Sequence, residues 1–320
     1  MKTVGLMSIA LCTGLILTCT PAQAQQQDYA AWKAERIRTL GAGGKLAHTK
    51  LGDIEYADVG QGIPSLSLHG TPGGYEVAIA SRAATPAAET AGTRMISVSR
   101  PGYLRTPVES GRTFEQQADL FAALLDELKI DRVVVTASSG GSYAGLQFAL
   151  RHPDRTIALV MFAPALGHEP MPDGIVYDAA AFQAEDKQMR MIADAPPTMA
   201  FPGYDPKTPE EKSFLKTVLL SRTPVDMHFV GRRNDFLQRS DPKVDQWPLE
   251  KIKVPVLIVH GTKDENSDYN LSVKAAARIP NAKLITLEGS DHFFPITRAA
   301  DTRRHVHNFL ANIPGATPRQ

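Results

Sequence analysis

Short apolar segments alternate with helical patterns along most of the chain. Residues 53–59 (DIEYADV) alternate between polar and apolar side chains, which is typical of a strand with one buried face. Residues 156–164 (TIALVMFAP) are almost entirely apolar, which indicates a strand buried on both faces. Further strands are predicted in the segments SLSLHG, RMISVSRPG, RVVVTA, VPVLIVHGTKD and KLITLEG. Because helices separate these strands, the sequence predicts the α/β class, with a mostly parallel central sheet and helices on both faces.

The helical segments carry recognisable start and stop signals. Thr113, with Gln116 three residues later, forms a capping-box pattern ahead of an apolar stripe that ends at Leu128. Further helices are expected at about 28–41, 143–151, 272–279 and 297–313. The first of these has Asp28 as its expected cap and Gly41 as its stop, and we expect it to pack across the outside of the domain.

The first 24 residues have the order of a secretory signal. Lys2 is followed by the apolar run Val4–Leu17 and by the small-residue stretch Ala22–Ala24. We expect cleavage after this stretch and export to the periplasm or out of the cell. The apolar run is short for a bilayer span, and no membrane span is expected in the mature chain. A lipoprotein anchor at Cys19 is the alternative, but Thr18 before it is larger than the glycine, alanine or serine expected there.

The mature chain, residues 25–320, fits a single α/β domain that carries an insertion. Between about 165 and 250 the long apolar strands stop and Met, Pro and charged residues become frequent, so this stretch is expected to form a helical cap over one end of the sheet. Both cysteines, Cys12 and Cys19, lie in the segment to be removed. The mature protein therefore has no disulfide framework, thiolate chemistry or Cys-ligated metal. Nothing in the sequence indicates the oligomeric state.

Charge and loop composition narrow the expected partners. The chain has 35 Lys and Arg residues and 34 Asp and Glu residues, and removal of Lys2 with the signal leaves the mature protein neutral. A neutral balance argues against binding to nucleic acid. The GAGG segment at 41–44 lacks the G-x-G-x-x-G spacing and a preceding strand, and no phosphate loop occurs, so no cofactor is expected. The expected partner is a small-molecule substrate.

A serine-rich turn follows the predicted strand RVVVTA. In ASSGGS, Ser139 has the small residues Ala137 and Gly141 two positions before and after it, as a nucleophile elbow requires between a strand and a helix. Ser138 and Ser142 are rival hydroxyls, but their flanking positions fall on a β-branched threonine or inside the helix. The alternative interpretation is that the small residues form only a tight connection. Ser139 is the candidate nucleophile.

Two backbone amides are candidates for an oxyanion hole. Gly140 follows the serine at the N-terminus of the predicted helix, where a backbone N–H is free to face a developing oxyanion. In LSLHGTPGGYE, the glycines after a short strand allow a second N–H, that of Thr71, to approach a substrate. A simple Gly/Pro turn with a packed histidine is the alternative. His69 is expected to hold this loop rather than to catalyse.

A serine nucleophile needs an imidazole base and a carboxylate that orients it. Asp264 follows the strand VPVLIVHG and His292 follows the strand KLITLEG, so serine, acid and histidine occur in this order, each after its own predicted strand. Asp268 is a competitor for the acid. The segment around it imitates the start of a calcium loop but lacks the required glycine and glutamate, so no metal is expected. Asp291 is expected at the surface.

These motifs together resemble the α/β-hydrolase superfamily over nearly all of the mature chain. The resemblance rests on HGTPGG, SRPGYLRTP, ASSGGSYAG, PVLIVHGTKD and EGSDHFF. It implies acyl transfer with Ser139 as nucleophile, Asp264 as acid and His292 as base. It also implies an oxyanion hole formed by the backbone N–H groups of Thr71 and Gly140.

The chain departs from the family pattern at two positions. Ala137 replaces the glycine that usually stands two residues before the nucleophile. Leu104 replaces the second glycine of the R-P-G-Y-G stretch found in many members.

We expect an enzyme that hydrolyses a small apolar carboxylic ester through an acyl-enzyme. A serine aminopeptidase of the proline iminopeptidase kind is similar in the H-G-x-P-G loop and in the Gly-Gly-Ser after the nucleophile, but it needs cap carboxylates to hold a substrate amine, and the acidic cap residues here are scattered. An alternative of another class is a non-catalytic periplasmic binding protein with the hydrolase fold.

Apolar and aromatic residues of the insertion are candidates for the pocket wall or for the core of the cap: Met171, Met189, Met191, Met199, Phe201, Tyr204, Met227, His228 and Phe229.

Overall fold

The computed structural model describes residues 21–170, 178–201 and 204–316. In these ranges one sheet contains eight strands: β1 (Lys45–Thr49), β2 (Gly52–Gly60), β3 (Ile63–Leu68), β4 (Thr93–Val98), β5 (Val133–Ser138), β6 (Thr156–Phe162), β7 (Val256–Gly261) and β8 (Ala282–Leu287). Their order across the sheet is β1-β2-β4-β3-β5-β6-β7-β8. β2 is antiparallel to both of its neighbours, and all other pairs are parallel. The predicted mostly parallel sheet is confirmed.

Both faces of the central strands are buried. In β5, Val133 and Val135 belong to one hydrophobic core, whereas Val134 between them belongs to another. The same alternation continues through β6 and β7. Because successive side chains of a strand point to opposite faces, a strand between two cores must be apolar at nearly every position. This requirement explains the continuous apolar runs in the sequence.

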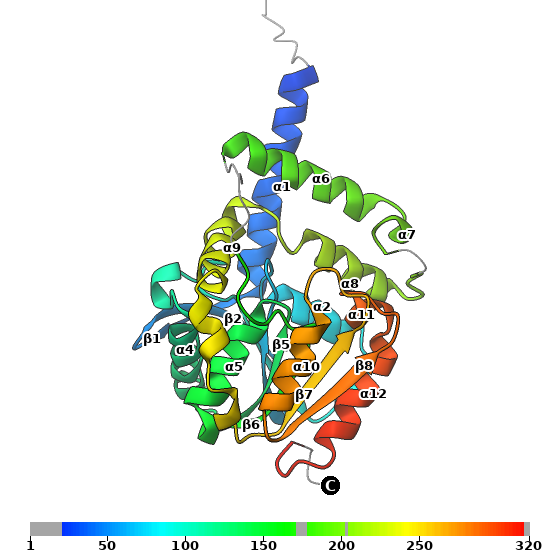
Figure 1. Ribbon diagram of the computed structural model, residues 1–320. Helices are drawn as coiled ribbons and strands as arrows, with labels where there is room; N and C mark the ends of the chain where they lie inside the picture. Colours follow the sequence, from blue (N-terminus) through cyan, green and yellow to red (C-terminus); the bar gives the residue numbers. More distant parts are fainter. Residues whose placement is uncertain (1–20, 171–177, 202–203, 317–320) are drawn as a thin grey trace, which may run out of the picture.

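Helices cover both faces of the sheet (Figure 1). On one face lie α4 (Phe114–Glu127), α5 (Gly141–Arg151) and α10 (Tyr269–Arg278), and on the other lie α2 (Glu76–Ala83), α11 (Phe294–Thr297) and α12 (Ala299–Leu310). The short α3 (Ala87–Thr90) precedes β4. The predicted capping box of α4 is confirmed, because the Thr113 side chain accepts from the N–H of Gln116 while the Gln116 side chain accepts from the N–H of Thr113.

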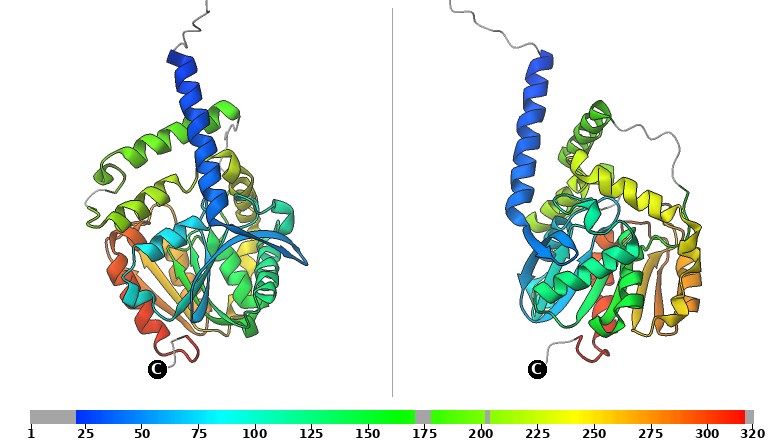
Figure 2. Two further views of the ribbon diagram at one scale, coloured as in Figure 1. Left: turned by 180° about the vertical axis from the view of Figure 1, so that it is seen from behind. Right: turned by 90° about the vertical axis from the view of Figure 1, so that its left-hand side faces the viewer.

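The stretch 165–250 is helical in its described part. It contains α6 (Ala179–Asp194), α7 (Pro197–Ala200), α8 (Pro209–Leu220), α9 (Asp226–Arg239) and two short 3₁₀ turns, and no strand is found in the described residues of this stretch. Figures 1 and 2 show these helices gathered over one end of the sheet.

The first helix, α1 (Pro21–Gly43), is longer than the sequence pattern predicts. It begins before Asp28, so the expected cap at that residue is wrong. Figure 2 shows α1 running beside the helices above the sheet, and the Tyr29 hydroxyl donates to Asp186 of α6 (2.8 Å). The expected signal segment, residues 1–24, lies mostly outside the described residues. Across the described ranges, none of the helices is both long enough and apolar enough to cross a bilayer.

Candidate active site

Ser139 occupies the turn between β5 and α5 in a strained backbone conformation. Its φ is +47°, in the left-handed region that residues other than glycine rarely adopt. Its N–H donates to the carbonyl oxygen of Phe162 (2.9 Å), and its own carbonyl oxygen accepts from the N–H of Ala165 (3.2 Å) and of Ser142 (3.0 Å). Hydrogen bonds to the end of β6 therefore help to hold the strain, as in a nucleophile elbow.

Small residues allow α5 to approach the strand ends closely. A Cβ on Gly141 would clash with the carbonyl oxygen of His69. A Cβ on Gly145 would lie 3.0 Å from the Cβ of Ala137, which is fully buried. Gly145 thus makes room for the methyl group that Ala137 brings in place of the usual glycine. The helix α5 therefore accommodates alanine in place of the family's glycine at position 137.

The second departure, Leu104, also has a local explanation. Its φ is +51°, a left-handed conformation that glycine adopts without strain. The N–H of Leu104 donates to the carbonyl oxygen of Met227 in α9 (2.8 Å). The backbone therefore keeps the shape suited to the family's glycine, and a hydrogen bond to the cap region helps to hold it there.

His292 and Asp264 come together at the ends of neighbouring strands. His292 Nδ1 lies 2.7 Å from Asp264 Oδ2, although the two residues are separated by 28 positions. Asp264 Oδ1 accepts from the N–H groups of Asn266 and Ser267, both at 2.9 Å. Burial by itself would raise the pKa of the Asp264 carboxyl, but hydrogen bonds from His260 and His292 outweigh it and hold this pKa well below its usual range. Asp264 is therefore an ionised carboxylate that accepts from the imidazole.

The rival acids have other roles. Asp268 Oδ1 accepts from the N–H of Asn270 and caps α10. Asp291 Oδ1 accepts from the N–H of Phe293 (2.9 Å) in the loop after β8. Within the described parts of the chain, no group of three or more His, Cys, Asp or Glu side chains is arranged to hold a metal ion.

His260 is a site residue that the sequence pattern does not indicate. It is the fifth residue of β7 and is fully buried. Its Nε2 lies 3.0 Å from Asp264 Oδ2, the oxygen that also contacts His292, and its Nδ1 lies 2.7 Å from Ser272 Oγ. In the sequence this histidine is the one polar side chain in a strand that is otherwise apolar, and this contrast was the available signal.

Ser139 and His292 line the same cavity, which has a volume of about 350 Å³. Ser138 lines it too, whereas Ser142 is fully buried within α5. The loop after β3 closes one side, because a Cβ on Gly70 would lie 3.2 Å from Ser139 Cβ and 3.8 Å from its Oγ. The structure thus brings the hydroxyl, the imidazole and the glycine-rich loop to one place.

Thr71 and Gly140 are neighbours at this site. A Cβ on Gly140 would lie 3.5 Å from the backbone N of Thr71 and would overlap with its Oγ1. The loop after β3 and the start of α5 are therefore in contact, and only glycine leaves space at position 140. Two backbone segments with N–H groups thus adjoin Ser139, as an oxyanion hole requires.

His69 holds the loop after β3 and is not placed as the catalytic base. Its Nε2 accepts from the N–H of Arg100 (3.0 Å), and its Nδ1 lies 2.7 Å from the carbonyl oxygen of Gly70. Burial, together with the nearby Arg100 charge, keeps the pKa of His69 well below its usual value. The ring is therefore neutral and tied to the backbone on both sides.

Residues from both the sheet and the helices above it line the cavity. Strand residues Ser67 and Thr136 form part of its floor, and the helices α2, α8, α11 and α12 contribute further lining residues. Among the apolar and aromatic residues expected from the insertion, Tyr204 lines it. Met191 and Met199 are instead exposed, and Met171 lies outside the described residues. From the described part of the insertion, α8 also lines the cavity, through Glu211, Phe214 and Val218.

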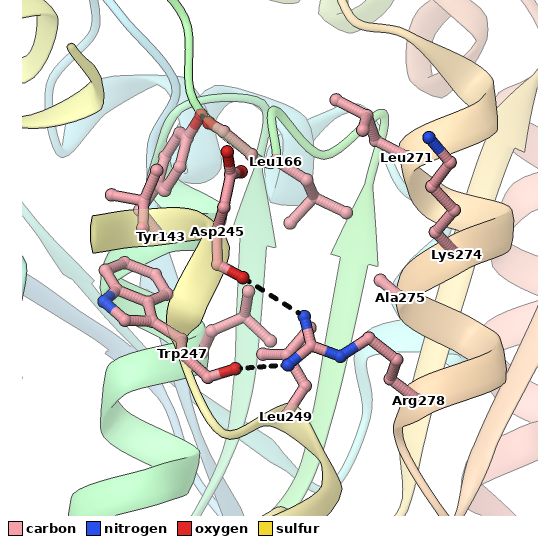
Figure 3. A pocket seen from close by; sticks show the side chains of 12 residues that line it. Tyr143, Leu166, Asp245, Trp247, Leu249, Leu271, Lys274, Ala275 and Arg278 are labelled. Atoms are coloured by element: carbon pink, nitrogen blue, oxygen red, sulfur yellow. Dashed lines mark hydrogen bonds between the residues drawn. The ribbon is translucent and has the colours of Figure 1, made fainter. Parts of the chain in front are cut away.

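A second cavity, of about 330 Å³, lies on the other face of the sheet beside α5 and α10 (Figure 3). Arg278 donates to the carbonyl oxygens of Asp245 (3.5 Å) and Trp247 (2.5 Å) at its wall. Neither Ser139 nor His292 contributes to its lining. The Arg278 guanidinium thus holds the chain around the second cavity. The candidate nucleophile Ser139 and the candidate base His292 belong to the first cavity.

Comparison with known proteins agrees with the geometry of the site. Residues 66–304 match the model of the alpha/beta hydrolase family. A bifunctional esterase/perhydrolase from Acinetobacter calcoaceticus is 27% identical over 237 residues, covering 68% of this chain and 82% of that protein. A 2-hydroxy-6-oxononadienedioate/2-hydroxy-6-oxononatrienedioate hydrolase from Burkholderia vietnamiensis is 26% identical over 278 residues, covering 80% of this chain and 90% of that one.

A solved structure of an alpha/beta hydrolase fold protein from Nakamurella multipartita is similar in both sequence and shape. It is 30% identical, with a TM-score of 0.71, and the match covers 83% of this chain and 98% of that one. The match to the family model spans most of the chain, and it includes the turn at Ser139 and the loops of Asp264 and His292. The protein therefore belongs to the alpha/beta hydrolase family of enzymes.

Proposed function

We propose that this hydrolase cleaves small apolar carboxylic esters by a serine acyl-enzyme mechanism. The observation that carries the proposal is the 2.7 Å contact between His292 Nδ1 and Asp264 Oδ2, at the wall of a cavity that Ser139 also lines. A hydroxyl, an imidazole and a carboxylate in this order are the groups that acyl transfer requires. The similarity to an esterase/perhydrolase supports the choice of an ester.

In the first half of the reaction, Ser139 is the nucleophile and His292 the base. Asp264 is a carboxylate and can only accept, so His292 Nδ1 carries a proton and Nε2 presents its lone pair. Ser139 Oγ attacks the ester carbonyl carbon while Nε2 takes the hydroxyl proton. The carbonyl π electrons move to oxygen and form a tetrahedral oxyanion. This intermediate collapses, the C–O bond to the alcohol breaks, and Nε2 returns the proton to the leaving alcohol.

The backbone N–H groups of Thr71 and Gly140 stabilise the oxyanion. Each such donor contributes about 3 kcal/mol to lowering the barrier in enzymes of this type. In the second half of the reaction, His292 takes a proton from water, the resulting hydroxide attacks the acyl carbon, and the carboxylic acid leaves as Ser139 regains its proton. Besides the ester and water, every group used in these steps is a side chain or backbone amide of this chain.

The charged residues of the cavity favour an ester over the N-terminus of a peptide. Besides histidine, the charged lining residues in the described ranges are Glu211 and Arg303. Glu211 Oε2 accepts from the N–H groups of Lys207 (2.6 Å) and Thr208 (3.2 Å) and caps α8. Arg303 Nε donates to Glu89 (2.6 Å). An aminopeptidase needs a carboxylate directed at the substrate amine, and Glu211 is already committed to the helix cap.

Covalent labelling with a fluorophosphonate tests the nucleophile. We expect the wild-type protein to be labelled and Ser139→Ala to be unlabelled, with turnover reduced at least about 10⁴-fold. Ser138→Ala is the matched control, because this hydroxyl lines the same cavity one residue away. Labelling of Ser139→Ala, or loss of labelling in Ser138→Ala alone, would reject Ser139 as the nucleophile. An unlabelled and inactive wild-type protein would favour the non-catalytic binding protein.

A substrate panel tests the leaving group. We expect p-nitrophenyl esters of short and medium acyl chains to be hydrolysed much faster than the p-nitroanilides of proline and alanine. Fast turnover of the anilides without turnover of the esters would favour the aminopeptidase.

We also propose that the protein is exported and that the segment up to residue 24 is removed. The order of charged, apolar and small residues in this segment supports the proposal. N-terminal sequencing of the protein secreted by its natural host tests it. A start at Gln25 agrees with cleavage, whereas a lipid-modified Cys19 would indicate a membrane-anchored protein instead.

A further inference from the structure

A buried carboxylate from the insertion lies beside the glycine-rich loop after β3. Asp235, in α9, is 1% exposed. Its Oδ2 accepts from the Thr71 hydroxyl (2.5 Å) and from the Tyr103 hydroxyl (2.6 Å). Arg100 donates to both carboxylate oxygens, at 2.6 Å and 2.9 Å. A residue 164 positions away in the chain thus binds the side chain of Thr71 directly.

Arg100 extends this network along the loop. Its guanidinium is fully buried and donates to the carbonyl oxygens of His69 (2.9 Å) and Gly70 (3.1 Å). One of its terminal nitrogens also donates to Thr71 Oγ1 (3.2 Å). Three consecutive loop residues are therefore held by one ion pair. Burying two charges is costly even when they are paired, so a gain in stability alone does not explain this pair.

The hydroxyl of Thr71 is held from two sides. Because the Asp235 carboxylate can only accept, the hydroxyl proton of Thr71 points to it, while the oxygen of the same hydroxyl accepts from Arg100. These two bonds fix the side chain of Thr71 against Gly140, where a Cβ would overlap with Oγ1. The backbone N of the same threonine lies 3.5 Å from that Cβ position. Holding the side chain therefore also holds the direction of the N–H.

The helix that carries Asp235 is fixed to the domain beneath it. The N–H of Gly231 in α9 donates to the carbonyl oxygen of Gly102 (2.8 Å), and the N–H of Leu104 donates back to Met227 of α9 (2.8 Å). A Cβ on Gly102 would lie 2.6 Å from the Cα of Gly231, so the two backbones are in close contact. The close backbone contact between α9 and the loop after β4 therefore fixes the position of Asp235.

We propose that Asp235 is a positioning residue for the oxyanion hole: through the Thr71 hydroxyl it directs the Thr71 N–H at the reacting carbonyl oxygen. This inference rests on the proposed serine hydrolase function. It gives the insertion a part in the chemistry, because one of its helices supplies the group that holds an oxyanion donor in place.

The matched pair Thr71→Val and Thr71→Ser tests the proposal while both charged residues of the buried ion pair stay in place. Valine has nearly the shape of threonine but no hydroxyl, whereas serine keeps the hydroxyl. We expect Thr71→Val to lower kcat for p-nitrophenyl butyrate at least tenfold with KM changed less than threefold, and Thr71→Ser to keep kcat within threefold of wild type. The rate of fluorophosphonate labelling should fall in the same proportion, because the phosphonyl oxygen occupies the oxyanion position. If valine prevents folding, Thr71→Ala removes the hydroxyl without adding bulk.

Asp235→Asn and its neighbour Asn234→Ala complete the experiment. Asp235→Asn should also lower kcat at least tenfold at unchanged KM. Asn234, on the same helix, donates to the carbonyl oxygen of Arg112 (2.7 Å), away from the loop, so Asn234→Ala should keep kcat within twofold even if its melting temperature falls. Equal kcat values for the valine and serine variants would overturn the proposal.

Ser139→Ala distinguishes a failure of the proposed serine mechanism from a failure of the proposed role of Asp235. If Ser139→Ala keeps its activity, the proposed serine mechanism fails. If it is inactive while both Thr71 variants turn over like wild type, the mechanism stands and the role of Asp235 is rejected.

Discussion

His260 and Asp264, four residues apart at the end of β7, are joined by a buried hydrogen bond of 3.0 Å between Nε2 and Oδ2. The same oxygen lies 2.7 Å from His292 Nδ1, so one carboxylate oxygen accepts from two imidazoles. Ser272 Oγ, 2.7 Å from His260 Nδ1, fixes the other edge of the buried ring. The orientation of Asp264, and through it that of His292, therefore depends on a side chain that no substrate can reach.

Replacing His260 by phenylalanine should impair both catalysis and stability. The variant keeps a ring of similar size but removes one donor from Asp264. Hydrogen bonds to charged groups contribute about 1.5–3 kcal/mol, so we expect a loss of about 2 kcal/mol in the free energy of unfolding at pH 7. We expect kcat to fall about tenfold as the carboxylate loses its fixed direction. Steady-state kinetics and urea unfolding measure the two effects.

The pH dependence of this stability loss has a defined sign. The folded-state pKa of Asp264 is lowered, so its ionised form stabilises the protein above the unfolded-state value and this contribution is lost as the pH falls through the folded-state value. The difference between wild type and His260→Phe should therefore be full at pH 7 and shrink below about pH 4. Ser272→Ala, one step further from the carboxylate, is the milder control. An unchanged kcat in His260→Phe would show that Asp264 is oriented without it.

Lys129→Gly should stabilise the protein. Lys129 is exposed and follows α4 with a φ of +53°. Its N–H donates to Asp126 O (3.0 Å), and the N–H of Ile130 donates to Leu125 O (2.9 Å), which is the Schellman pattern that favours glycine at this position. Relief of the left-handed strain should raise the free energy of unfolding by about 1 kcal/mol. Urea unfolding measures it, and Lys129→Ala, which keeps the Cβ, should show no gain.

The central sheet could be predicted from the sequence because its local chemistry is decisive. β6 and β7 are apolar on both faces, and Thr113 with Gln116 marks the start of α4 unambiguously. β1 carries no such signal, because it is an edge strand whose residues are exposed or half-buried. The N-terminal helix extends further than its apolar spacing indicates because contacts with the insertion, such as Tyr29 with Asp186, lie outside any local pattern.

The candidate site was predictable only where a residue lies in the turn or loop at the carboxyl end of a strand. Ser139, Asp264 and His292 meet that condition, since the carboxyl ends of parallel strands meet at one edge of the sheet. Asp235 lies in a helix without a motif, and its partner Thr71 is 164 residues away. His260 is part of the strand itself. Their positions follow from the packing of α9 and β7 in the folded chain, which no single segment encodes.

Glu76→Gln should change how stability depends on pH. Glu76 lies at the start of α2 with 12% of its side chain exposed, and burial raises the pKa of its carboxyl to about 7 despite Arg36 at 3.3 Å. A carboxyl with a raised folded-state pKa stabilises the protein fully below its unfolded-state pKa, and this stability is lost as the pH rises through about 7. Glutamine stays neutral at every pH. The variant should therefore gain roughly 2–3 kcal/mol relative to wild type between pH 5 and pH 8.

Urea unfolding at several pH values measures this gain. Glu35→Gln, on the exposed side of α1, is the control, because the pKa of Glu35 is lowered by its hydrogen bond with Arg38 and no gain at high pH is expected there. A constant difference between Glu76→Gln and wild type from pH 5 to pH 8 would contradict the raised pKa of Glu76.

Thr136→Phe should shorten the acyl chain that the enzyme accepts. Thr136 precedes Ser139 by three residues in the chain, and Thr136 and its cross-strand neighbour Ser67 both line the cavity. At about 3.3 Å per residue, the cavity extends on the order of 10 Å along the sheet from the nucleophile. A phenyl ring at position 136 would fill its lower part and leave the space beside Ser139 open. We expect kcat/KM for p-nitrophenyl octanoate to fall at least tenfold while that for the acetate stays within threefold.

Thr136→Val, which keeps the size of the side chain, should hydrolyse both esters like wild type. An equal loss for both esters in Thr136→Phe, with an unchanged melting temperature, would mean that the acyl chain lies in another part of the cavity, such as the space between α8 and α11.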